Sequence, residues 1–271
     1  MHKSWPVLLL PLPLVVLFFV NSPATSAERR PTRPTPSQAS PPSPSPKAGF
    51  AHGETLTYLA LLNELPAGDA ELRLHREQQD GRDIYRVTGR ARTNEYLDYL
   101  YKLRGSAEGR FTANSLTPLF FHLAYADKGR PRELEVRYDA KTKTLQGSSK
   151  RKNKVAERNV PATNVYDPST ALYLFRSANL APGKSFQVEV FTGKERYRIV
   201  AQVIKREEVQ LTSGTRPAIR LRPMVFSLDD DPQKNLLPEE TTLWVAPDTT
   251  HTPLKLESYL PIGQVALELR R

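Results

Sequence analysis

From Glu54 to the C-terminus, apolar and polar residues alternate in short runs. Alternation with a period of two is typical of a β-strand that packs one face and exposes the other. The runs follow one another at intervals of roughly 8 to 15 residues, with turn residues such as Asp80-Gly81 between them. Connections this short favour antiparallel pairing, because parallel strands need a long crossover. The predicted strands are Glu54–Leu61, Ala70–Leu74, Asp83–Thr88, Gly105–Thr112, Pro118–Tyr125, Arg132–Tyr138, Thr144–Gly147, Ser185–Phe191, Glu195–Val209, Arg216–Phe226, Thr241–Val245, Pro253–Tyr259 and Gln264–Leu269.

Two segments break this alternation and predict short helices. Asn94–Leu103 carries apolar residues at helical spacing, with Thr93 or Asn94 as a cap. Asp167–Arg176 begins with an aspartate at the N-cap and a proline at the first helical position. A flat open sheet of about a dozen strands would expose unpaired edges. We therefore expect an all-β, mainly antiparallel fold, a long curved meander forming a barrel or half-barrel with two short helices. Two stacked sheets are the alternative.

The first 27 residues have the pattern of a secretory signal. Lys3 precedes an apolar run from Val7 to Val20, and small residues lead to a cleavage site after Ala27. The apolar stretch is shorter than the roughly 20 residues that a spanning helix needs. The sequence thus predicts export to the periplasm, with no integral membrane segment once the signal is cleaved. An uncleaved segment that anchors the chain in the inner membrane is the alternative.

Residues 28–49 are rich in proline and serine, especially Pro31–Pro46. Such a segment cannot bury enough apolar surface to fold and favours extended polyproline II. We expect a disordered linker there and a single β-rich domain over residues 50–271.

Composition and charge exclude several kinds of chemistry. The chain of 271 residues has no cysteine, which excludes disulfides, thiolate metal sites and a cysteine nucleophile. Its net charge of +10 would suggest nucleic acid in a cytoplasmic protein, but an exported chain meets anionic lipids and wall polymers instead. The densest basic run predicts contact with an anionic surface, and a solvated hairpin loop is the alternative. It consists of Lys150, Arg151, Lys152 and Lys154.

No recognisable catalytic motif occurs in the chain, and its five histidines are scattered. We therefore expect no enzyme activity, metal or cofactor. Asp229–Asp231, the densest acidic run, predicts a solvated turn, with a weak calcium site as the alternative.

Tyrosines cluster in the first predicted helix and could form the floor of a pocket for an amphipathic ligand. The expected ligand contacts are Tyr96, Tyr101 and Arg104 there, with Tyr173 and Arg176 of the second helix. Ordinary packing of both helices on the sheet is the alternative.

A series of short motifs runs through the domain. They are Gly53–Tyr58, Pro66–Ala70, Asp167–Tyr173 with Arg176, Leu180–Gly183, Trp244 with Asp248, Pro253–Lys255 and Pro261–Gly263. In this order and spacing they resemble the bacterial exported family known as domain of unknown function 3108 (DUF3108). The resemblance implies a signal-bearing envelope protein of mostly β structure and supplies no reaction or catalytic residues. The long proline-rich linker and the Asp229–Asp231 loop depart from the family pattern.

Together these features predict a monomeric, non-enzymatic periplasmic protein that binds or escorts an amphipathic ligand, such as a lipid, a lipoprotein or another envelope component. An interaction or assembly factor for envelope complexes is the first alternative. A hydrolase of wall polymer or polysaccharide is the second.

Overall fold

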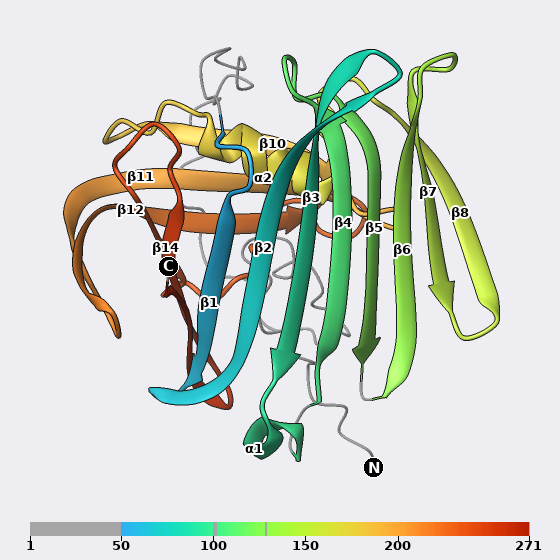
Figure 1. Cartoon of the computed structure of the whole chain (residues 1–271). Coiled ribbons are helices and arrows are strands. Elements are labelled where there is room, and N and C mark those ends of the chain that lie inside the picture. The colour runs from blue at the N-terminus through green and yellow to red at the C-terminus, as the bar shows by residue number, and fades with distance from the viewer. Residues whose placement is uncertain (1–49, 100–101, 128, 271) are drawn as a thin grey trace.

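The computed structural model describes residues 50–99, 102–127 and 129–270 (Figure 1). In this part of the chain, fifteen strands form one strongly curved sheet that is nearly closed into a barrel. The strands are β1 (Thr55–Leu62), β2 (Leu65–Gln79), β3 (Arg82–Thr93), β4 (Arg104–Thr112), β5 (Pro118–Asp127), β6 (Arg130–Asp139), β7 (Thr144–Arg151), β8 (Lys154–Pro161), β9 (Val165–Tyr166), β10 (Ser185–Phe191), β11 (Arg196–Leu211), β12 (Gly214–Ser227), β13 (Thr242–Val245), β14 (Pro253–Leu260) and β15 (Gly263–Leu269). The helices are α1 (Glu95–Asp98) and α2 (Pro168–Arg176).

The sheet is a meander in which almost every strand pairs with its neighbour in sequence. Its order runs from β8 down to β1, continues through β15, and descends again to β9. The first and last strands pair with each other, with Tyr58 opposite Leu269. The break in the sheet therefore falls between β8 and β9, which follow one another in the chain. The predicted all-β meander that curls into a barrel shape is confirmed.

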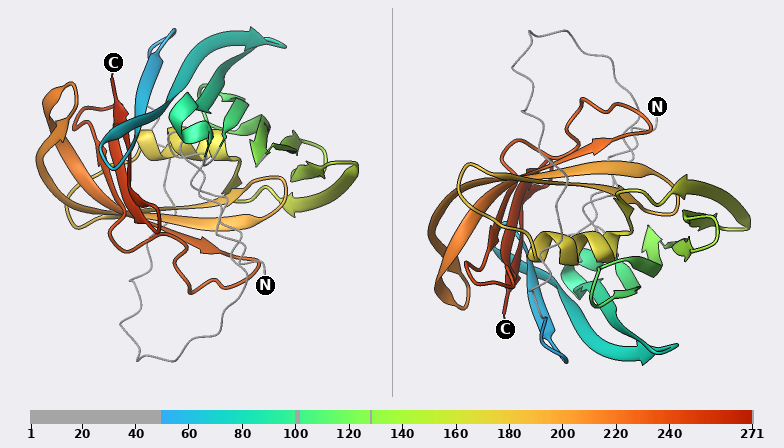
Figure 2. Two further views of the ribbon diagram at one scale, coloured as in Figure 1. Left: turned by 90° about the horizontal axis from the view of Figure 1, so that it is seen from below. Right: turned by 90° about the horizontal axis from the view of Figure 1, so that it is seen from above.

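Helix α2 fills the interior of the curved sheet. It connects β9 to β10, and these two strands form a parallel pair. A parallel pair needs a crossover, and here the crossover helix lies on the concave side, between the two halves of the sheet (Figure 2). Asp167 caps it by accepting hydrogen bonds from the backbone amides of Ser169 and Thr170. The predicted start of this helix is confirmed.

The core is formed by the inward-facing positions of the strands packed on α2, every residue of which is buried. Close approach occurs where the helix begins, beside β4. A Cβ added at Gly109 would lie 2.0 Å from the Ser169 hydroxyl oxygen, so only glycine fits there. The position of the helix is therefore encoded in the strand as well as in the helix itself.

The gap between β8 and the rest of the barrel is bridged by an ion pair. Arg158 of β8 donates to both carboxylate oxygens of Asp229, at 2.6 and 2.8 Å, and to the carbonyl of Lys194. The backbone amide of Arg196 also donates to Asp229, at 2.7 Å. Residues 229–231 are exposed, as expected for a solvated turn, but Asp229 also has specific partners 33 and 71 residues away in sequence. Sequence spacing carries no sign of such a contact.

Several predicted bounds differ from the structure; β2, for example, is 15 residues long and extends beyond the predicted Ala70–Leu74 at both ends. The sequence predicts no strand over β8, whose residues are mostly exposed, with Val160 buried. The first helix is a single turn capped by Asn94, whose side chain accepts from the Leu97 amide. Within its described residues only Leu97 is buried, so Tyr96 does not share the packed face that a longer helix would have given it.

Candidate functional site

Arg176, at the end of α2, is a fully buried charged residue. Its two terminal nitrogens each lie 2.7 Å from a carboxylate oxygen of Glu54, just before β1. Its Nε donates to the Thr250 carbonyl at 3.0 Å. The guanidinium carbon lies 4.9 and 5.0 Å from the ring centres of Phe50 and Tyr173. This network ties the interior helix to the first strand and to the loop before β14.

The polar groups around this network have fixed protonation states. Burial alone would lower the pKa of Arg176, but the hydrogen bonds to Glu54, together with the electrostatic effects of Tyr173, Glu54 and Tyr58, outweigh it and hold the pKa above its ordinary value. Burial raises the pKa of the Tyr58 and Tyr173 hydroxyls above their usual range. The Tyr58 hydroxyl donates to the Pro253 carbonyl at 3.1 Å. These groups stay in one charge state across physiological pH.

The space left beside α2 is small. A cavity of about 30 Å³ lies between the helix and strands β10 to β14. Its lining is formed almost wholly by apolar side chains, among them Leu172, Phe175, Phe186 and Leu243. That volume has room for only one or two water molecules. This cavity is therefore too small to hold a lipid chain.

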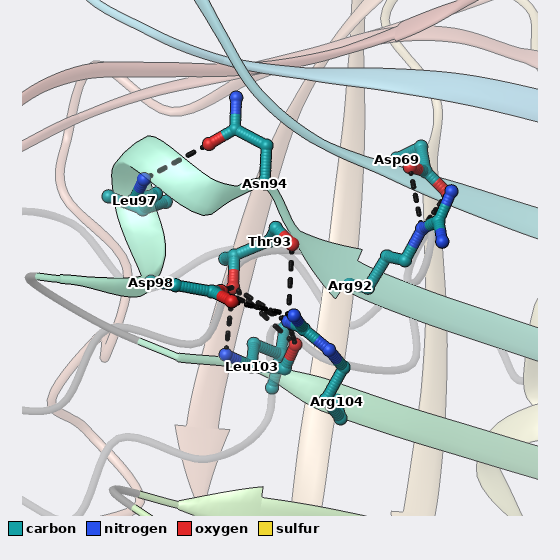
Figure 3. Close-up of polar contacts among 8 residues, drawn as sticks. All are labelled: Asp69, Arg92, Thr93, Asn94, Leu97, Asp98, Leu103 and Arg104. Atoms are coloured by element: carbon teal, nitrogen blue, oxygen red, sulfur yellow. Dashed lines mark hydrogen bonds and ion pairs between the residues drawn. The ribbon is translucent and has the colours of Figure 1, made fainter.

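The described residues of the turn between β3 and β4 are held by polar contacts, although several of them face solvent. Figure 3 shows Arg104 beside Asp98, with nitrogen–oxygen distances of 3.0 and 2.6 Å. The buried Thr93 hydroxyl accepts from the Leu103 amide at 2.9 Å and donates to Asp98. Arg92 reaches across to Asp69 at 3.0 Å. These contacts fix the base of α1 on the sheet.

Exposed apolar side chains collect at the end of the sheet that carries α1. The turns β1–β2, β3–β4, β5–β6, β7–β8 and β14–β15 all lie at this end, because neighbouring antiparallel strands reverse direction (Figure 1). We call this surface the α1 end. Six of the seven large hydrophobic residues exposed in the described chain lie on it, and the seventh, Ile204, lies within β11. The six, with their exposed fractions, are Leu65 (70%), Tyr96 (87%), Tyr99 (96%), Val155 (60%), Tyr259 (51%) and Ile262 (44%).

A charged groove of about 710 Å³ begins beside this end and crosses β2 to β6. Most of its lining residues alternate along the strands with core positions, so their side chains point away from α2. Arginines face carboxylates across it. The charged residues are Asp69, Glu71, Arg90, Arg92, Arg104, Arg132 and Glu133. Arg104 belongs both to this groove and to the support of α1, so the polar groove and the apolar end adjoin.

The basic run at Lys150–Lys154 forms the turn between β7 and β8, at the α1 end. Lys150 pairs with Glu133 of β6, with 3.3 Å between nitrogen and oxygen. Arg151, Lys152 and Lys154 are exposed. The predicted hairpin turn is present, and its contact with an anionic surface stays a prediction.

Metal-binding chemistry has no visible centre in the described residues, where no three metal-ligating side chains come together. His52 and His75 are neighbours, with ring centres 6.1 Å apart, and His52 accepts a hydrogen bond from the Arg76 amide. His251 contacts the Arg176 carbonyl through Nδ1 at 3.0 Å. Neither described helix has the length and apolar character needed to cross a bilayer.

The structure separates the predicted ligand contacts into two groups. Tyr96 and Arg104 lie at the α1 end, whereas Tyr173 and Arg176 are buried around α2. Tyr101 lies outside the described residues. Sequence reasoning missed the partner of Arg176, Glu54, although it lies inside one of the family motifs. It also missed Leu65, Val155, Tyr259 and Ile262, which come together only through the strand order.

Comparison with known proteins identifies a family but no activity. The family model described as "Protein of unknown function (DUF3108)" matches residues 55–270. No curated protein matches. Among solved structures, the chain is similar to a β-barrel-like protein of domain of unknown function DUF1849 from Brucella abortus, with a TM-score of 0.52 and 10% identity over 80% of this chain and 95% of that one. It is also similar to a protein with a YmcC-like fold from Bacteroides fragilis, with a TM-score of 0.36 and 11% identity over 82% and 95% of the two chains. The first likeness supports the barrel-like fold alone.

Proposed function

The chain belongs to the DUF3108 family of proteins of unknown function, and on that premise we propose that it is a non-enzymatic periplasmic protein that binds an amphipathic envelope component, a lipid or a lipoprotein, at its α1 end. The observation that carries this proposal is the collection of six exposed hydrophobic residues at one end of the sheet. Exposed apolar side chains that share one end of a molecule point to a surface that contacts a partner or a membrane. The predicted secretory signal provides the route to the envelope.

The filled interior directs the proposal to the surface. Lipid-carrying barrels hold their ligand inside a cavity, but here α2 lies in the interior, and the cavity beside it has a volume of only about 30 Å³. The Glu54–Arg176 pair holds the helix in place. We therefore place the ligand outside, where Tyr96 and Tyr99 meet solvent.

The amphipathic character of the ligand follows from the two surfaces that adjoin at Arg104. Apolar side chains on the turns provide contacts for an acyl chain or an apolar peptide segment. The charged groove beside them, with Arg90 and Arg92 in its lining, provides contacts for a polar head group. Tyrosine suits such a boundary because its ring is apolar and its hydroxyl is polar.

Hydrogen–deuterium exchange with lysophosphatidylcholine micelles tests this placement. We expect slower exchange in the peptide spanning residues 94–104 and no change in α2. The double variant Tyr96→Ser, Tyr99→Ser should lose most of this protection, and Ile204→Ser, the matched exposed residue away from the α1 end, should keep it. Protection that is absent at 94–104, or that appears at α2 instead, contradicts the proposal.

A second candidate function is an assembly factor for envelope complexes, favoured by the same apolar surface. In that case the α1 end binds a protein. Micelles would then give no protection at residues 94–104, whereas crosslinking from Tyr99 in the envelope would capture a defined polypeptide.

A further inference from the structure

We infer that the partner of the α1 end is the surface of an anionic lipid bilayer, on which the barrel docks end-on. This inference rests on the proposed function and names its partner. It is carried by a second observation, which is that the basic turn between β7 and β8 lies at the same end as the exposed aromatic residues. Apolar insertion and head-group attraction would therefore act in the same direction.

The apolar side chains have the composition of an interfacial anchor. Three of the six are tyrosines, which concentrate at membrane–water boundaries because one part of the side chain is apolar and the other is polar. They are spread over separate turns rather than forming one groove. Four of the five turns at this end carry at least one of them, namely β1–β2, β3–β4, β7–β8 and β14–β15. A surface of this kind fits an extended flat partner better than a single ligand molecule.

The charges at the same end favour anionic lipid. Exposed basic residues lie on three of its turns, and these are Lys102, Arg130, Arg151, Lys152 and Lys154. Two exposed carboxylates lie on the described parts of the turns at this end, Glu64 between β1 and β2 and Glu95 between β3 and β4. Several nearby arginines already have carboxylate partners, as Arg92 does with Asp69 and Arg104 with Asp98. The unpaired excess is therefore positive, and it is complementary to phosphate head groups.

The basic turn offers a clean test, because the opposite end of the sheet carries a matched set of charges. Arg82, Lys141 and Lys143 are exposed on the β2–β3 and β6–β7 turns. Both sets contain one arginine and two lysines. Lys152 and Lys143 even share a left-handed backbone, with φ of 54° and 53°. Replacement of either set by glutamine lowers the net charge of the protein by the same amount. The two variants differ only in the end of the sheet from which the positive charge is removed.

Since the chain has no cysteine, a single introduced cysteine carries a fluorescent reporter at a chosen place. We would label Ile262→Cys at the α1 end or Thr142→Cys at the opposite end, in the full chain. The probes are vesicles of phosphatidylcholine alone and vesicles of equal parts phosphatidylcholine and phosphatidylglycerol. A local reporter distinguishes docking of this end from attachment through the N-terminal segment.

We expect the label at position 262 to enter an apolar environment on the anionic vesicles, and the label at 142 to stay in water. Each basic side chain near an anionic bilayer strengthens binding roughly fivefold. Glutamine at 151, 152 and 154 should therefore raise the lipid concentration for half-binding by about a hundredfold, because three such contributions multiply. Glutamine at 82, 141 and 143 should leave it within about twofold. Added salt should weaken the wild-type response.

The other outcomes separate the two proposals. An equal response at 262 to both kinds of vesicle, unaffected by the glutamine variant, overturns the anionic bilayer but leaves an amphipathic partner in place. A response at 262 only to an acylated peptide overturns the bilayer in favour of a lipoprotein. Silence toward vesicles and acylated peptide alike overturns both proposals.

Discussion

Replacement of Glu54 by glutamine removes the only carboxylate that the described structure places against the guanidinium of Arg176. The Arg176 side chain is fully buried, and the Glu54 side chain is 15% exposed. Glutamine is nearly the same size, so the perturbation is the loss of one charge from a two-point ion pair. The positive charge that remains is fully buried and has no carboxylate partner among the described residues.

The expected cost is about 3 to 5 kcal/mol of unfolding free energy, which is typical of removing one partner from a buried pair. The Nε bond to the Thr250 carbonyl and the rings of Phe50 and Tyr173 remain and offset part of the loss. In a domain of this size, 1 kcal/mol corresponds to roughly 2 to 4 °C in Tm, so we expect a decrease of about 6 to 20 °C.

Urea unfolding monitored by circular dichroism measures this cost, with an unchanged denaturant slope as the check that unfolding remains two-state. The double variant Glu54→Met, Arg176→Met is the informative control, because it removes both charges and keeps apolar volume. We expect it to be more stable than Glu54→Gln, since well-packed apolar pairs often replace buried ion pairs at little cost. A Glu54→Gln variant within 1 kcal/mol of wild type would refute the reasoning. So would a double variant less stable than the single one.

Three further predictions concern the packing of α2 and the closure of the barrel. Gly109→Ala should cost about 1 to 3 kcal/mol through its clash with α2, whereas Gly105→Ala in the same strand, where the nearest atom is 3.6 Å away, should cost less than 1 kcal/mol in thermal unfolding. Asp167→Ala should lower the unfolding free energy by about 2 kcal/mol through loss of the helix cap. Asp167→Asn should cost less, because burial already raises the pKa of the aspartate and an amide oxygen can still cap the helix. Equal losses for the two variants in urea unfolding would contradict this. Burial would raise the pKa of Asp229, but the hydrogen bonds from Arg158 and the Arg196 amide outweigh it and lower the pKa. The contribution of Asp229 to the unfolding free energy is therefore complete above the pKa of the unfolded state, near 4, and is lost as the pH falls through the lower pKa of the folded state. Asp229→Asn should be slightly less stable at pH 7 and lose less on acidification, and parallel acid-unfolding curves for the two proteins would count against this ion pair.

Much of the architecture was accessible from sequence because it is written in local patterns. Period-two alternation indicated the strands, and the Asp167-Pro168 pair marked the start of α2. The short connections indicated the antiparallel meander. Each of these signals lies within a few residues of the feature it specifies.

The rest depends on contacts between distant segments. Strand β8 has little alternation, because its edge position leaves most of its side chains exposed. Glu54 and Arg176 are 122 residues apart, and nothing in their spacing links them. The placement of α2 inside the barrel follows from the parallel β9–β10 pair, whose first strand has only two residues and is too short to be seen as a pattern.

The candidate site shows the same division. Tyr96 and Arg104 were recognisable as a local cluster, and the basic turn as a run of charge. Leu65, Tyr259 and Ile262 were not, because isolated apolar residues in turns are common. Their location at one end of the sheet becomes evident only from the pairing of β1 with β15, which brings the first and last hairpins to the same end.

The most direct test of the account is photo-crosslinking in living bacteria, with benzoylphenylalanine placed singly at Tyr96 or at Ile204. Both side chains are exposed, and only Tyr96 lies at the α1 end. After ultraviolet irradiation, mass spectrometry of the purified protein should find a lipid adduct at position 96 and none at 204. Adducts at both positions, or at neither, would contradict the claim that the α1 end meets the amphipathic partner.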